Sequence, residues 1–222
     1  MKDKVVIFGT SIFSLVAYQT IVQEELAEVV GFTLNEKFIQ EPKLEGLDIY
    51  PFEYLTDCVD MKECKILVAL GYKKMNDNRK AVYDKCKELG FNIFTLISKR
   101  ATLYTTEIGE GSIILPTAFV GPYVSIGKSV ILWNNVSICH HNRIGDFTHI
   151  AGGTTIGGET NIGSNCFIGM NCTFKNNIEV GDRTFVGANS YMSQNTEGGL
   201  GFVGNPATNP RGAKSDLMIK FL

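Results

Sequence analysis

A repeat of six residues runs through the second half of the chain and restricts its fold more than any other feature. Fifteen consecutive blocks extend from Ile108 to Glu197 without a slip, and each block opens with an apolar residue. Glycine follows that residue in nine blocks, and a small or β-branched residue occupies the fifth place in every block except the one that contains Asn142. A period of six is neither helical nor a simple strand alternation. It predicts a parallel β-helix, in which short strands turn corners at regular steps.

The repeat also predicts how the coils are filled. Three blocks of six residues complete one triangular coil, so fifteen blocks give about five coils. The opening residue of each block points into the coil, the small fifth residue lies near a corner, and the glycine suits a tight turn at that corner. One coil cannot bury its own inward row, but stacked coils bury each row against the next.

The first hundred residues have a different pattern, in which strands alternate with helices. Strands are expected at residues 5–8, 29–33, 66–70 and 91–95, and helices at 13–27 and 76–89. This order predicts a small Rossmann-like parallel α/β domain over residues 1–100, followed by the β-helix domain over residues 101–222. The second domain ends with a Gly- and Pro-rich loop that leaves the rod after Glu197, and with a short helix over residues 215–222.

Ligands of parallel sheets bind at the carboxyl ends of strands, next to helix N-termini. In this chain the rule indicates Gly9–Ser11 and Gly71–Tyr72, with phosphate contacts from the nearby cations, which are Lys73, Lys74 and Arg79. The loop GTSIF does not match the GxGxxG pattern, so no dinucleotide cofactor is expected. A plain turn between strand and helix, with those cations on a solvated face, is the alternative.

Composition excludes several functions. The net charge is −2 and no basic run is present, so nucleic acid is not an expected partner. No apolar stretch is long enough to cross a membrane, and the first residues lack the apolar core of a secretory signal. The six cysteines form no CxxC pair, and we expect reduced thiols in a cytoplasmic protein.

All three histidines of the chain fall within ten residues, at the third, fourth and sixth places of their blocks. None of His140, His141 and His149 holds an inward first place, so we expect all three to project outward and form a site. One of them is suited to act as a general base in acyl transfer, because the unperturbed pKa of imidazole is near neutrality. A zinc site of three histidines is the alternative, but adjacent residues of an extended chain point in different directions, so no metal is expected.

Several motifs together resemble a known family. They are VVIFGTS, ILVALGY, ICHHNRIGDFTHIAGGTTIGG, IGMNC and FVGNPA. In these motifs and their order the chain resembles the NeuD/PglD-type nucleotide-sugar acetyltransferases of bacterial polysaccharide biosynthesis, within the left-handed β-helix acyltransferase superfamily. The resemblance implies a left-handed β-helix, acetyl-CoA as acyl donor, and a homotrimer whose active sites lie between neighbouring rods.

The resemblance also assigns roles to residues. His140 is the expected catalytic base, and His141 stands where the family commonly has an acidic or amide residue. Contacts to acetyl-CoA are expected from His149, Gly158, Met170 and Ala188. The nucleotide sugar is expected to contact Ser11, Ile12, Phe13, Gly71 and Tyr72.

The expected reaction is N-acetylation of a nucleotide-linked deoxyamino sugar, with direct attack of the amine on the thioester. Backbone N–H groups at Gly157 and Gly158 are candidate donors to the oxyanion, and Asp146 or a neighbouring chain is a candidate source of negative charge for the base. Cys139, next to His140, raises an acyl-enzyme alternative. The sequence also allows O-acetylation of a sugar of the sialic acid type, a zinc-dependent carbonic-anhydrase-like activity, and a non-catalytic trimeric rod with a ligand-sensing α/β domain.

Overall fold

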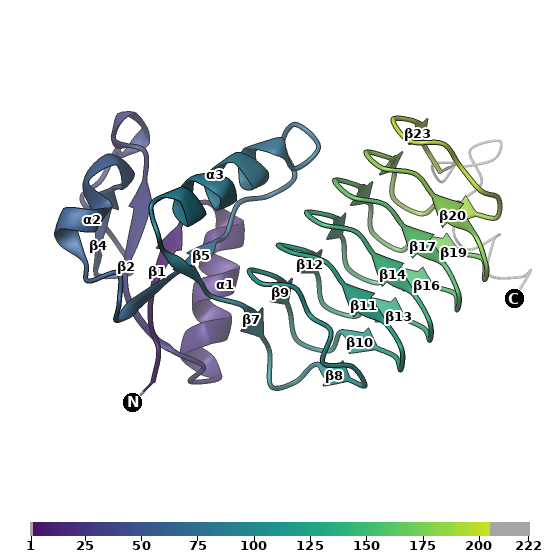
Figure 1. Ribbon diagram of the computed structural model, residues 1–222, viewed down its shortest axis with the longest axis horizontal. Helices are drawn as coiled ribbons and strands as arrows, with labels where there is room; N and C mark the ends of the chain where they lie inside the picture. The colour runs from purple at the N-terminus through teal and green to yellow at the C-terminus, as the bar shows by residue number, and fades with distance from the viewer. Residues whose placement is uncertain (1, 205–222) are drawn as a thin grey trace, which may run out of the picture.

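A computed structural model describes residues 2–204 and shows an α/β domain beside a β-helical rod (Figure 1). The sheet of the first domain has the strand order β3-β4-β2-β1-β5-β6. Its strands are β1 (Lys4–Phe8), β2 (Glu28–Leu34), β3 (Lys43–Leu44), β4 (Leu47–Pro51), β5 (Cys64–Val68) and β6 (Asn92–Ile93). All neighbours are parallel except β3 and β4. The sheet is therefore the predicted parallel α/β sheet with one antiparallel edge strand.

Helices cover both faces of this sheet. Its helices are α1 (Ile12–Gln23), α2 (Leu55–Cys58) and α3 (Asp77–Glu88), with 3₁₀ turns η1 (Glu36–Phe38) and η2 (Phe52–Tyr54). In β1, Val5 and Ile7 pack in the cluster that includes α1, whereas Val6 and Phe8 pack in the cluster that includes α3. Because both faces of β1 are covered, its sequence is apolar without alternation.

The predicted helices and first three strands agree with the structure within a few residues, but the fourth expected strand does not. Of the strand expected at 91–95, only β6 forms, in the α/β sheet, and β7 (Leu96–Ile97), which lies just beyond that range, pairs with a strand of the rod. Pairing within the rod thus begins a few residues before position 101. The hairpin of β3 and β4 and the short helix α2 had no periodic signal, and sequence reasoning missed them.

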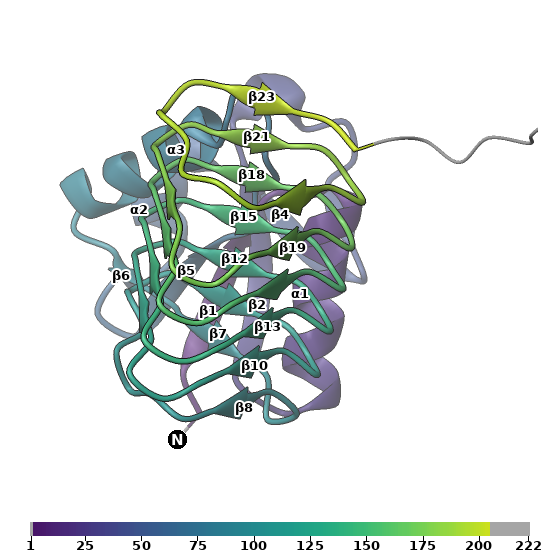
Figure 2. The same cartoon turned by 90° about the vertical axis from the view of Figure 1, so that its right-hand side faces the viewer.

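The rod has three parallel sheets, as the hexapeptide repeat predicts for a left-handed β-helix. One contains β8 (Thr102–Leu103), β10 (Phe119–Val120), β13 (Ser137–Ile138), β16 (Thr155–Ile156), β19 (Thr173–Phe174) and β22 (Tyr191–Met192). The second contains β11 (Ser125–Ile126), β14 (Arg143–Ile144), β17 (Asn161–Ile162) and β20 (Glu179–Val180). The third contains β7, β9 (Ile113–Ile114), β12 (Ile131–Leu132), β15 (His149–Ile150), β18 (Phe167–Ile168), β21 (Phe185–Val186) and β23 (Gly201–Phe202). Figure 2 shows their coils stacked from β8 to β23.

From β9 to β22, each rod strand consists of the sixth residue of one block and the first residue of the next. From Ile114 to Met192 the first residues are at least 95% buried and form the core of the rod, as predicted. The corner differs from the expectation, because the residue with positive φ is at the fourth place, as at Asn165 and Asn171. The glycine at the second place answers a different need: a Cβ on Gly145 would lie 2.5 Å from the carbonyl carbon of Gly163 in the next coil.

The chain does not leave the rod directly after Glu197, which corrects the sequence prediction. Gly201 and Phe202 form β23, and this strand pairs in parallel with β21. The helix expected at 215–222 lies outside the described residues. Within residues 2–204, no helix has both the length and the apolar character needed to cross a membrane.

Candidate functional site

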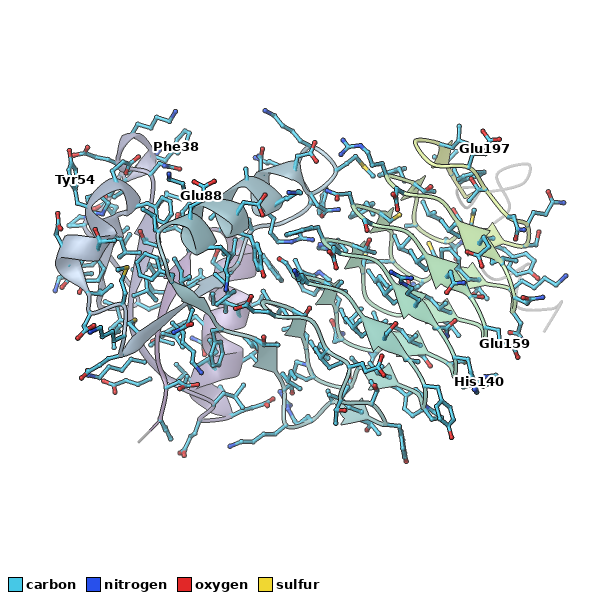
Figure 3. The ribbon with its side chains drawn as sticks, viewed as in Figure 1. Phe38, Tyr54, Glu88, His140, Glu159 and Glu197 are labelled. Carbon is cyan, nitrogen blue, oxygen red and sulfur yellow. The ribbon has the colours of Figure 1, made fainter. Side chains whose placement is uncertain are left out.

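His140 and His141 lie at the corner between β13 and β14, and both side chains are exposed. Figure 3 shows His140 at the edge of the rod. His141 has φ of 56°, so the chain turns sharply between the two residues instead of running extended. Their rings therefore face one another, with the two Nδ1 atoms 3.0 Å apart, and the expectation that they point in different directions is wrong. In such a contact one Nδ1 carries the hydrogen and the other accepts it, so the pair exposes one Nε2 acceptor and one Nε2–H donor.

Asn142 explains why this block departs from the repeat. At the fifth place, other blocks have hydroxyls such as Thr148, which accepts a hydrogen bond from the backbone N–H of Cys166, eighteen residues later. Asn142 does the same, because its Oδ1 accepts from the backbone N–H of Thr160 at 2.6 Å. Its Nδ2 also donates to the carbonyl oxygen of Cys139 at 2.9 Å, which closes the turn that carries the two histidines. The buried amide thus fixes the corner on which the histidine pair stands.

Gly158 lies directly against the His140 ring. A Cβ at position 158 would be 2.5 Å from Cε1 of His140, so only glycine leaves room for the imidazole in this position. The neighbouring Gly157 N–H already donates to Phe174 O, which removes it as a free oxyanion donor. Asp146 lies at the next corner, where its Oδ1 accepts from the backbone N–H of Lys128. It therefore serves the stacking of the coils and is not the partner of His140.

His149 has the opposite environment. Its side chain points out of the coil, as expected, but the α/β domain covers it, so the residue is only 3% exposed. Trp133 Nε1 donates to His149 Nε2 at 2.9 Å, and Nδ1 has no hydrogen-bond partner. Burial, together with the positive charge of Arg79, lowers the pKa of His149 to about 3. The ring is therefore neutral near pH 7, and because Nε2 accepts, Nδ1 carries the hydrogen.

A cleft of about 620 Å³ opens beside His149, between the α/β domain and the third sheet of the rod. Aromatic rings form much of its wall: Phe13, Tyr72, Trp133, Phe167 and Phe185. The rings of Phe167 and Phe185 are stacked with centroids 5.2 Å apart, and the ring of Tyr72 lies 4.4 Å from that of Phe167.

Sequence reasoning named Phe13 and Tyr72 but missed the rings that the rod contributes, although a signal for Phe167 and Phe185 was present. Residues that occupy the sixth place of every third block share one face of the rod, because three blocks complete one coil. On the face of the cleft these residues are Ile131, His149, Phe167 and Phe185. A column of large rings on one outer face indicates a surface that another part of the molecule or a ligand covers.

The structure brings together six of the predicted binding residues around the cleft. They are Phe13, Gly71 and Tyr72 from the α/β domain and His149, Met170 and Ala188 from the rod. Five others are not among the residues that line it: Ser11, Ile12, His140, His141 and Gly158. The site predicted from the sequence is thus divided between two surfaces of one chain.

The loop before α1 is largely engaged in structural contacts. The Ser11 side chain accepts from Ser14 N–H, and Ser14 Oγ in turn accepts from Ser11 N–H, which forms a capping box at the start of α1. Ile12 is 83% exposed and Phe13 packs against Trp133 with ring centroids 5.3 Å apart. Of the three residues, Phe13 is the one that reaches the cleft.

Arg79 does not meet solvent or phosphate, contrary to the sequence prediction. It is fully buried, and its guanidinium donates to the carbonyl oxygens of Ser129 and Phe147 in the rod at 3.2 and 2.6 Å. It also donates to the carbonyl oxygens of Leu70 and Gly71 at 3.3 Å. Arg79 therefore fixes the end of β5 and the Gly71 loop against the rod, while Lys73 and Lys74 are exposed.

The structure also bears on the zinc alternative and on the cysteines. Among residues 2–204 no three His, Cys, Asp or Glu side chains gather closely enough to hold a metal ion. All six cysteines have free thiols, and Cys139 is partly exposed at the histidine corner. Burial raises the pKa of the Cys166 thiol to about 11, so this cysteine is a protonated core group.

The fold and the repeat together define a class of protein. Residues 159–194 match the bacterial transferase hexapeptide family, which is described by six repeats. The order of domains and the three-sheet rod confirm, at the level of the fold, the predicted resemblance to hexapeptide-repeat acyltransferases of the NeuD/PglD type.

Solved structures with this fold cover nearly the whole chain. The acetyltransferase domain of PglB from Neisseria gonorrhoeae FA1090, in complex with acetyl coenzyme A, superimposes with a TM-score of 0.81 at 22% identity, over 94% of this chain and 99% of the other. PerB from Caulobacter crescentus, in complex with CoA and GDP-perosamine, gives 0.81 at 19% identity, over 92% and 96%. WeeI from Acinetobacter baumannii AYE gives 0.79 at 21% identity, over 92% and 98%. Comparison with curated protein sequences gives no match.

Proposed function

We propose that this protein is an acetyl-CoA-dependent N-acetyltransferase that acts on the amino group of a nucleotide-linked deoxyamino sugar. The observation that carries the proposal is the histidine pair at the corner, because the Nδ1 contact between His140 and His141 leaves an exposed Nε2 free to take a proton. The shared fold supports it, since the similar structures include an acetyltransferase domain bound to acetyl coenzyme A and a protein bound to CoA and GDP-perosamine.

The chemistry needs one base and no covalent acyl-enzyme. The neutral amine attacks the thioester carbonyl and forms the C–N bond, and its proton moves to Nε2 of His140. The C–S bond then breaks, and the thiolate of coenzyme A leaves and takes up that proton. A base in this role contributes about 10² to 10⁴ in rate. His149 is not the base, because its ring is buried and its pKa is lowered to about 3.

The cleft is the proposed binding surface for both substrates. The buried Nδ1–H of His149 lacks a protein partner and is a suitable donor to a carbonyl oxygen of acetyl-CoA. Met170 and Ala188 extend the same wall along the rod, whereas Gly158 serves at the histidine corner. Phe13, Gly71 and Tyr72 face the acceptor, and Ser11 and Ile12 contribute at the rim of the α/β domain.

A complete site requires two chains under this proposal. The histidine corner lies between β13 and β14, whereas the cleft extends along the third sheet to Met170 and Ala188 at a different corner. A homotrimer of parallel rods places a corner of one rod against a different face of the next. His140 of one chain then completes the cleft of its neighbour.

The test is a thiol-release assay with acetyl-CoA against nucleotide-linked 3-amino and 4-amino sugars, with sialic acid as the hydroxyl acceptor. The proposal predicts release that depends on an amino sugar and that mass spectrometry assigns to the N-acetylated product. Thiol release with sialic acid alone would instead indicate an O-acetyltransferase. No release with any acceptor would contradict acyl transfer to these sugars.

A further inference from the structure

A third aromatic residue belongs to the histidine corner. Tyr123 occupies the fourth place of its block, eighteen residues before His141, so the two residues stand one above the other on adjacent coils. Their rings are stacked with centroids 4.6 Å apart and an interplanar angle of 27°. The backbone supports the same arrangement, because His141 N–H donates to Pro122 O at 3.0 Å.

The stack has a consequence for His140. Exposed side chains on a corner sample several rotamers, and a base that rotates freely is seldom aligned with its substrate. The His141 ring is held from below by Tyr123 and contacts His140 through Nδ1, so the three rings form a continuous series from one coil to the next. On the far side of His140, Gly158 leaves space for the ring against the backbone. His140 is thus supported on both sides.

We propose that Tyr123 and His141 form a positioning pair that holds His140 in the tautomer with Nδ1–H and a free Nε2. The expected effect on kcat rests on the proposed acetyl transfer, whereas the expected tautomer of His140 does not. When the amine proton arrives at Nε2, His140 becomes an imidazolium whose Nδ1–H bonds to the neutral His141. The positive charge of His140 is then stabilised by the acceptor nitrogen of His141, where a carboxylate would otherwise serve. The aromatic face of Tyr123 lies behind His141.

An acidic residue stands on the coil above the two histidines. Glu159 lies one coil above His141 and close to His140 in Figure 3. Its backbone N–H donates to His140 O at 3.0 Å, and its carboxylate has no hydrogen bond to either ring. Tyr123 stacks on the His141 ring, and the partly exposed Cys139 directly precedes His140 in the chain. Glu159→Gln removes the carboxylate charge and keeps the size of the side chain, so this variant tests whether that charge affects the histidine pair.

The first test observes the tautomer directly, without any substrate. The chain has only three histidines, so ring-nitrogen NMR of the isotope-labelled full-length protein gives three resolvable systems. The expected spectrum has His140 in the Nδ1–H form and His141 in the Nε2–H form, with His149 as a buried reference. In Tyr123→Asn the His140 signals should move toward the average of freely exchanging tautomers. Asn is chosen because residue 123 has φ of 58°, which Asn tolerates.

The second test is kinetic and uses matched variants. Tyr123→Phe keeps the ring and should match the wild type, whereas Tyr123→Asn should lower kcat about tenfold with little change in KM. His141→Phe keeps the stack but removes the acceptor nitrogen, and it should lower kcat at least as much. Tyr54→Leu removes an exposed tyrosine at the opposite end of the molecule and should change neither the spectrum nor kcat (Figure 3).

Three outcomes overturn the positioning role. They are a His140 tautomer that is unaffected by Tyr123→Asn and His141→Phe, a spectrum in which His140 carries Nε2–H in the wild type, and a kcat that falls equally in Tyr123→Phe and Tyr123→Asn. If no acetyl transfer is found but the predicted spectrum is, the positioning pair stands and the proposed function fails.

Discussion

His140 and His149 are nine residues apart in the same repeat, and the structure gives them opposite environments. His140 is exposed at a corner and contacts another imidazole, whereas His149 is buried beneath the α/β domain and contacts Trp133. The repeat determines the direction of each side chain, and both point out of the coil. What covers that direction decides the environment: open space leaves His140 accessible, and a docked domain leaves His149 neutral with a buried Nδ1–H.

Removal of His140 tests the exposed half of the comparison and should have the largest effect. His140→Ala should lower turnover about 10³-fold, or about 4 kcal/mol in activation free energy, because the proposed mechanism assigns proton removal to His140. The side chain is exposed, so the melting temperature should stay close to that of the wild type. Steady-state kinetics and thermal unfolding check both parts, and turnover within a factor of a few of normal would exclude His140 as the base.

Loss of Arg79 tests the docking that buries His149. Arg79→Met leaves the carbonyl oxygens of Ser129 and Phe147 without their donor, and it should lower the free energy of unfolding by about 3 kcal/mol. Urea denaturation measures the change. Lys80→Met is the control one residue later, where an exposed pair with Asp84 is lost and about 0.5 kcal/mol or less is expected. Equal effects of the two variants would contradict a fixed interface.

The buried histidine should also make stability depend on pH. Its pKa is lowered to about 3 in the folded protein, below the ordinary value of 6.5, so between these values the unfolded chain binds more protons. Stability therefore falls as the pH drops below about 6.5. From pH 7 to pH 5 the wild type should lose about 2 kcal/mol more than His149→Gln, which has no imidazole to protonate. Parallel unfolding curves for the two proteins would show that His149 is accessible to solvent.

A methyl group at position 158 tests whether the position of the exposed His140 ring matters. Gly158→Ala places a Cβ where the His140 ring lies, and the ring is able to rotate away with little cost in stability. Turnover should fall about tenfold because the base is displaced. Gly201→Ala is the control, since nothing lies within 4 Å of its added Cβ. Equal activities of the two variants would mean that the position of the His140 ring is unimportant.

Cys139 should have the smallest effect. The Asn142 side chain donates to the backbone oxygen of Cys139, and this contact does not involve the thiol. Direct attack of the amine on the thioester needs no thiol either. Cys139→Ala should keep turnover within about twofold of the wild type. A folded but inactive variant, or an acylated cysteine in the mass spectrum of wild-type protein incubated with acetyl-CoA, would favour the acyl-enzyme route.

Much of the fold follows from local pattern. The inward row from Ile114 to Met192 could be predicted because every member is an apolar residue buried in the centre of a coil. The end of α3 could be predicted because Gly90 follows it. The left-handed corners are less visible, because Thr, Tyr, His and Phe occupy the fourth place as well as Asn and Gly. For this reason the contact between His140 and His141 did not follow from the sequence.

The buried half of the candidate site was harder to predict. His149 is covered by Phe13 and Tyr72, which are more than seventy residues away in the chain, and no repeat relates those residues to the rod. Arg79 is of a residue type that commonly binds phosphate. In this structure it is buried between the two domains, because carbonyl oxygens of two rod corners accept its hydrogen bonds. Both cases depend on docking of distant segments, which local pattern does not report.

Mixing two inactive variants tests most directly the claim that the exposed corner and the buried cleft belong to different chains of one site. His140→Ala removes the base, and Ala188→Trp fills the cleft, so each protein alone should be inactive. When equal amounts are co-expressed and assemble at random, about a quarter of the sites combine an open cleft with an intact His140 from the neighbouring chain, and activity should reappear at about that fraction of the wild type. Mixed oligomers that remain inactive would contradict the account.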